Sequence, residues 1–198
     1  MAWNTANDIK NLALMELNHA TITDWADINN TDVPIVNAQH ELAKPVALSR
    51  YQWSFARKMA KMTLTALESD SIAWKYAVNL PTDALCDIAV YSTADKRMLI
   101  DWEVVGKTLY TNEETVYVEY TYEAPENVWT PEFVDWYKTF LAERLNGYLN
   151  GDMQREQLLQ SKEPVLFRTA KNIDSKRNKH ESLSTNPMLL VRGRFGLH

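Results

Sequence analysis

The sequence predicts an α+β fold in which a helical bundle built from the N- and C-terminal segments carries an inserted antiparallel β-sheet. Three observations predict it. Apolar residues recur at helical spacing as far as Tyr51, alternate with period two in short runs from Trp53 to Tyr122, and return to helical spacing after Thr130. The predicted division is a helical domain of residues 1–52 and 127–181, a β domain of residues 53–126, and an extended C-terminal docking tail of residues 182–198.

The composition is that of a chain with a packed core. Of the 198 residues, 45% are hydrophobic and 11% are aromatic, including seven tryptophans. A disordered chain carries far fewer such residues. The single cysteine, Cys86, forms no internal disulfide and no cysteine-based metal cluster, which fits assembly in a reducing cytoplasm. The first residues have neither a basic start nor an apolar run, so we expect no secretory signal and no membrane association.

Two helices are predicted before Trp53, where the apolar pattern changes from helical spacing to alternation. Thr5 or Asn7 can cap the first, which runs to about Leu17, and Thr31 can cap the second, which reaches Tyr51. Pro45 lies inside the second helical pattern, so a kink or break is expected near Ala43 or Lys44. His40 stands alone on this segment. We expect it to be exposed or half-buried, not a metal ligand.

The middle of the chain reads as strands joined by turns. A first strand begins near Phe55, and the Leu80-Pro81-Thr82-Asp83 turn ends a second. A hairpin loop at 112–114 is predicted to join the last two strands to each other. The predicted strands after the first are 74–79, 87–91, 98–105 (as one or two short strands), 109–110 and 116–122, all in one sheet over residues 55–123.

The strongest helix signal lies in the C-terminal third. Thr130 can cap a helix with Pro131 at its first position, and Gly151 can end it. The predicted apolar face consists of Phe133, Tyr137, Phe140, Leu141, Leu145, Tyr148 and Leu149. Asp152 then caps a second, antiparallel helix whose weaker apolar stripe, which includes Leu158, is interrupted by Pro164.

Residues at the helix-to-strand corner are predicted to form a wedge between two layers. Trp53 and Phe55 follow the last helical residues directly, and Arg57 begins the alternating pattern. Large aromatic side chains contribute most of the buried area in such corners. We therefore interpret Trp53, Phe55 and Arg57 as a structural helix-sheet corner.

This corner carries a resemblance to a known family. The run Ser49-Arg50-Tyr51-Gln52-Trp53-Ser54-Phe55-Ala56-Arg57-Lys58 is followed by Trp74-Lys75-Tyr76-Ala77-Val78-Asn79-Leu80-Pro81-Thr82-Asp83-Ala84-Leu85. Together they resemble the tail tubular protein A family, the head-to-tail adaptors of short-tailed phages. Chain length and the order of elements also fit. The first thirty and last fifteen residues carry little of the similarity.

The resemblance implies a structural protein of the virion neck and tail, assembled in the host cytoplasm, with no enzymatic activity. It implies a ring, twelvefold in assembled particles, that joins the portal protein to a nozzle protein similar to tail tubular protein B. DNA would pass through the ring during ejection without specific binding. The expected portal-docking residues combine apolar anchors with arginines in the C-terminal tail: Met188, Leu189, Leu190, Arg192, Arg194 and Phe195. Disorder of this tail is the alternative interpretation.

Charge is divided unevenly along the chain. The net charge is −5, but residues 1–167 carry 14 basic and 24 acidic side chains, whereas residues 168–198 carry seven basic and two acidic ones. An acidic body repels DNA phosphates, so a ring built from it should have a mostly acidic lumen. The basic segment of residues 168–198 is typical of a segment that binds an acidic protein surface or nucleic acid.

Two other function classes stay open. Asp101 and Glu103 lie two apart on an expected strand, as an acid and base of a tail-associated carbohydrate hydrolase would, although solvated edge charges explain them too. Arg57, Lys58 and Lys61 near aromatic residues are the pattern of a nucleic-acid-binding module. The five glycines form no phosphate-binding motif, and the four histidines lack metal-ligand spacing, so no cofactor or metal is expected. A structural thiol is the interpretation for Cys86.

Overall fold

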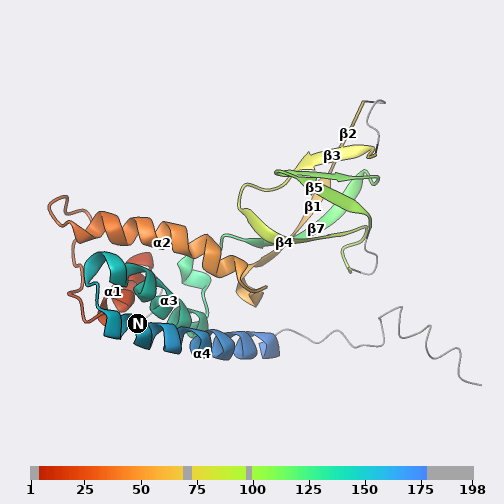
Figure 1. The fold of residues 1–198 in the computed structure, drawn as a ribbon. Coiled ribbons are helices and arrows are strands. Elements are labelled where there is room, and N and C mark those ends of the chain that lie inside the picture. The colour runs from red at the N-terminus through yellow and green to blue at the C-terminus, as the bar shows by residue number, and fades with distance from the viewer. Residues whose placement is uncertain (1–4, 69–72, 97–99, 178–198) are drawn as a thin grey trace, which may run out of the picture.

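The predicted fold class is confirmed by the computed structural model, which describes residues 5–68, 73–96 and 100–177. Helices from the two ends of the chain pack together, and two antiparallel sheets are inserted between them. Figure 1 shows the helices at one end of an elongated molecule and the sheets at the other. The end of α2 and the start of β1 connect the two parts.

The helical part is organised around α3. The described helices are α1 (Ala6–Glu16), α2 (Asp32–Ser49), α3 (Pro131–Leu149) and α4 (Met153–Arg177), and α1, α2 and α4 each contact α3. Ten residues of α3 are buried, among them Phe133, Trp136 and Tyr137. None of the helices in the described part of the chain combines the length and apolar character that a membrane span requires.

Helix ends follow the predicted capping chemistry in most places. Thr5 and Asp8 form a reciprocal capping box at α1, and the Thr130 hydroxyl accepts a hydrogen bond from the Phe133 amide at α3. Gly151 follows the end of α3 with a left-handed φ of +59°. The predicted side-chain cap at Thr31 is wrong, because the side chain of Asn30 accepts the Asp32 amide instead.

Of the kink or break predicted near Ala43 or Lys44, the break is wrong, since α2 continues without interruption through Pro45 to Ser49. Proline deprives the carbonyl four residues earlier of its hydrogen bond. That carbonyl belongs to Glu41, which is exposed, so water can take the place of the missing amide. Pro164 likewise lies inside an unbroken α4, and its unpaired carbonyl belongs to the exposed residue Gln160.

The strands form two sheets, not the single sheet that the sequence suggested. One has the order β1-β7-β4 and the other the order β2-β3-β6-β5, with every described pairing antiparallel. The bounds are β1 (Arg57–Thr63), β2 (Thr65–Ala66), β3 (Tyr76–Asn79), β4 (Ala84–Tyr91), β5 (Trp102–Val105), β6 (Thr108–Thr111) and β7 (Thr115–Tyr122).

The predicted hairpin between β6 and β7 is also wrong. β6 pairs with β5 through the two-residue turn Gly106-Lys107, where Gly106 has a φ of +64°. The buried Thr111 donates its hydroxyl to the Asp101 carbonyl at 2.8 Å, which holds the end of β6 against the segment before β5. Residues 112–114 therefore carry the chain from one sheet to the other. Met98 and Leu99, part of a predicted strand, lie outside the described residues.

Two apolar cores follow from this arrangement. The larger fills the helical part and includes Trp53, Ala124 and Trp129. The smaller lies between the sheets, with Val90, Val116 and Val118 from one sheet and Leu109 from the other. Two residues assigned to apolar helix faces are in fact exposed, Tyr148 by 64% and Leu158 by 53%. Tyr148 lies in the last turn of α3, and Leu158 lies on the side of α4 opposite its buried residues.

Candidate functional site

The helix-sheet corner is the joint between the two parts of the molecule. The first strand starts at Arg57, not near Phe55, because residues Ser54–Ala56 form a short 3₁₀ turn, η1. Trp53 is fully buried, and its indole N–H donates to the Ala47 carbonyl at 3.2 Å. Its ring lies within 4.9–6.1 Å, centroid to centroid, of the rings of Tyr51, Phe55, Phe133, Trp136 and Phe167.

Two buried carboxylates of α4 hold this corner in place. Asp174 accepts two hydrogen bonds from Ser54, one from its backbone amide at 3.0 Å and one from its side-chain hydroxyl at 2.6 Å. Glu163 accepts the indole N–H of Trp136 at 2.8 Å and the Arg50 guanidinium at 2.6 Å. Sequence reasoning missed both residues, although they share the helical spacing of the buried residues Leu159 and Ala170.

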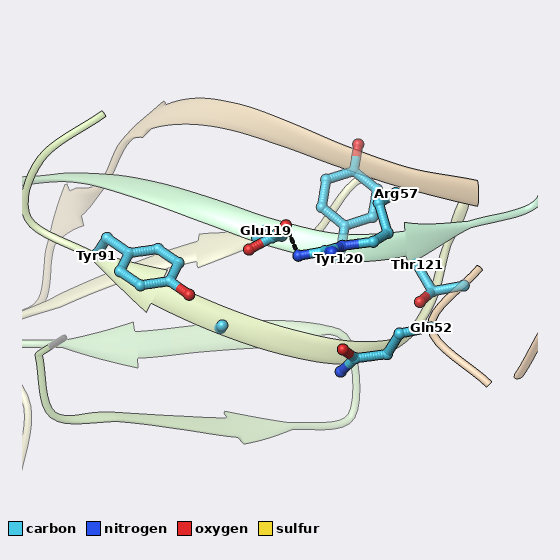
Figure 2. A pocket seen from close by; sticks show the side chains of 7 residues that line it. Gln52, Arg57, Tyr91, Glu119, Tyr120 and Thr121 are labelled. Carbon is cyan, nitrogen blue, oxygen red and sulfur yellow. Dashed lines mark hydrogen bonds and ion pairs between the residues drawn. The ribbon is translucent and has the colours of Figure 1, made fainter. Parts of the chain in front are cut away.

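Arg57 borders a polar cavity of about 110 Å³ at the start of the β part. Its guanidinium contacts Glu119 of β7 (Figure 2). Glu119 also accepts a hydrogen bond from Lys96 Nζ at 2.7 Å. Burial alone would raise the pKa of Glu119, but its ion pairs with Lys96 and Arg57 outweigh this and lower that pKa. A carboxylate kept ionised by two cations is poorly suited to proton transfer. The cavity is lined by Gln52, Arg57, Ala89, Tyr91, Glu119, Tyr120 and Thr121.

His40 lies in a buried polar network, so the expectation that it would be exposed or half-buried is wrong. Its side chain is 2% exposed, and Nε2 lies 3.0 Å from Glu126 Oε1 while Nδ1 lies 3.0 Å from the Tyr137 hydroxyl. Lys44 Nζ reaches the same Glu126 oxygen at 3.0 Å. The Tyr137 hydroxyl also lies within reach of the His40 backbone carbonyl, to which it donates at 3.3 Å. The network ties α2 to α3 and to the short turn η2 (Glu126–Val128).

Asp101 and Glu103 lie on the exposed surface of the β part. Asp101 precedes β5, both residues are exposed, and Glu103 accepts the indole N–H of Trp74 at 2.8 Å. Neither residue lines the cavity beside Arg57. Cys86 is half-buried in β4. Within residues 5–68, 73–96 and 100–177, no three His, Cys, Asp or Glu side chains are placed to hold a metal ion.

Two of the three basic residues suggested for nucleic-acid binding are engaged within the protein. Arg57 pairs with Glu119, and Lys58 Nζ lies 2.7 Å from Asp83. Lys61 is exposed on β1. The portal-docking residues predicted in the tail, from Met188 to Phe195, lie outside the described residues.

The outer face of α2 carries no charged side chain. We call this face the α2 stripe; with 100° per residue it covers about 120° of the helix surface, opposite the buried face. Leu42 is 61% exposed and Val46 is 44% exposed. A surface helix of a soluble protein ordinarily carries charged residues there. The α2 stripe consists of Pro34, Ala38, Leu42, Pro45, Val46 and Ser49.

Between Leu158 and Asn172 the outer face of α4 carries a second uncharged surface, which the exposed Lys176 ends in the last turn of the helix. The α4 stripe consists of Leu158, Ser161, Val165, Thr169 and Asn172, which lie within about 80° of one another around the helix. Leu158 is 53% exposed and Val165 is 60% exposed. The hydroxyls of Ser161 and Thr169 donate to carbonyls of their own helix at 2.8 and 3.0 Å. These hydroxyls are thereby satisfied, which lowers the cost of covering the stripe.

Comparisons with known proteins add no family to this description. A search against models of protein families found no match, and a search of curated proteins found none either.

Proposed function

We propose that this chain is a structural virion protein, the head-to-tail adaptor of a short-tailed phage, and not an enzyme. In this role it forms a ring that joins the portal protein to the tail nozzle protein. The α2 stripe is the observation that carries the proposal. α2 is an 18-residue helix with an apolar inner face and an uncharged outer face. Covering that outer face with another protein removes apolar surface from water and is therefore favourable in free energy.

The rest of the molecule suits a mechanical role. The aromatic corner and the buried acceptors Glu163 and Asp174 fix the end of α2 and the turn η1, from which β1 starts, to α3 and α4 through several independent contacts. A subunit that holds two other proteins in fixed positions relative to each other needs a rigid connection between its own parts. On this proposal the helical part makes side-by-side contacts, the sheets face the nozzle, and the acidic body lets DNA pass without binding.

Portal binding tests the proposal. The full chain should copurify with the portal protein encoded in the same genome, and deletion of residues 184–198 should abolish that complex. The helical CD signal and the melting temperature of the truncated chain should stay unchanged, because the described core ends before the deletion. Unchanged binding by the truncated chain would reject the docking role of the tail. Failure of the full chain to bind would reject the adaptor function.

A further inference from the structure

The two stripes lie on different sides of the helical part. α2 and α4 both pack on α3, and Figure 1 shows them on its two sides. Each stripe lies on the side of its helix away from the buried residues, so the two point away from each other. A single copy of the chain therefore cannot bring them together.

The stripes also match in length and in character. The α2 stripe runs from Pro34 to Ser49, about 22 Å, and the α4 stripe runs from Leu158 to Asn172, about 21 Å. Exposed Glu41 borders the first, and exposed Arg168 borders the second. The borders thus carry opposite charges, whereas two copies of one stripe would bring like charges together.

We infer that the α2 stripe of one copy packs against the α4 stripe of the next copy. Two different surfaces pointing away from each other form a heterologous contact, which repeats from copy to copy and closes into a ring when the rotation allows it. The inference rests on the proposed adaptor ring and assigns its subunit contact. It also explains why α2 has no charged outer face.

Cross-linking between the centres of the stripes tests this contact. In a Cys86→Ala background, Leu42→Cys and Val165→Cys are introduced into the same full-length chain. The protein, alone and with its portal protein, is treated with a short bis-maleimide. The expected product is a ladder of dimers, trimers and larger species in at least one of the two states. Each single-cysteine chain should give monomer only.

Charged variants show whether the stripes cause the ladder. In the double-cysteine chain, Val46→Arg or Leu158→Arg should each remove the species above monomer, because a buried unpaired charge opposes the contact. Gln160→Arg is the matched control on the exposed side of α4 away from the stripe, and it should keep the ladder. All three variants should melt as the parent chain does.

Three outcomes would overturn the inference. They are the absence of a ladder in both states, a ladder that persists in Val46→Arg and Leu158→Arg, and a dimer from the Leu42→Cys single variant, which would place α2 against α2. The cross-linking experiment and the portal-binding experiment can fail independently of each other. Portal binding without a ladder removes this contact alone, and a ladder without portal binding removes the adaptor role alone.

Discussion

Replacing Trp53 with alanine should lower the free energy of unfolding by about 3–5 kcal/mol, as truncation of a buried tryptophan does. Trp53 is fully buried and contacts aromatic rings from α3 and α4. Its removal would leave a cavity at the place where the helices meet the first strand. Urea unfolding followed by far-UV CD measures the change. Tyr148→Ala, at an exposed aromatic, is the control and should stay within about 0.5 kcal/mol of the parent.

A conservative variant separates packing from hydrogen bonding at the same position. Trp53→Phe keeps a ring in the cluster but loses the donor to the Ala47 carbonyl. Its cost should therefore be smaller than that of Trp53→Ala. A Trp53→Ala protein as stable as the parent would show that the aromatic cluster around Trp53 does not stabilise the helical core.

Acid should destabilise the protein through Glu126 over a defined pH range. Burial opposes ionisation of this carboxyl, but hydrogen bonds from His40, from its own backbone and from Lys44 outweigh it and lower the pKa from 4.5 to about 2. Because the folded-state pKa is the lower one, the stabilisation is fully present above pH 4.5 and is lost as pH falls toward 2. A shift of this size corresponds to at most about 3 kcal/mol.

The variant Glu126→Gln should remove this part of the acid sensitivity. At pH 7 it should be less stable than the parent, because Lys44 and His40 lose their charged acceptor. The difference between the two proteins should shrink as the pH falls through the range from 4.5 to 2. Urea unfolding at several pH values measures it. A difference that stays constant with pH would contradict the lowered pKa.

Local signals in the sequence predicted much of the helical part. Thr130 and Pro131 predict the start of α3, and Thr5, one of two candidate caps, predicts that of α1, because a cap is decided within a few residues. The strand at 102–105 also follows from local alternation. The pairing of strands does not. The apolar-polar alternation of β6 is compatible with pairing in either sheet. Its pairing with β5 is decided by tertiary contacts that the local sequence does not contain.

The buried polar contacts could not be predicted for a similar reason. His40 meets Glu126 and Tyr137, which lie 86 and 97 residues further along the chain. The apolar pattern of α2 contains no information that would predict these contacts. The sequence predicts Arg57 as a corner residue, but nothing in it indicates that Glu119 is its partner. The α2 stripe did leave a signal, since Ala38, Leu42 and Val46 recur every four residues outside an already apolar inner face.

Locating the chain in the virion tests the adaptor role most directly. If the proposal is right, the chain is encoded by a phage, and particles of that phage would be labelled with antibody against this protein and imaged by electron microscopy, with preimmune serum as the control. The predicted result is label confined to the neck, between the head and the tail. Label on the capsid surface or at the tail tip, or its absence from purified particles whose neck has been opened, would contradict that role.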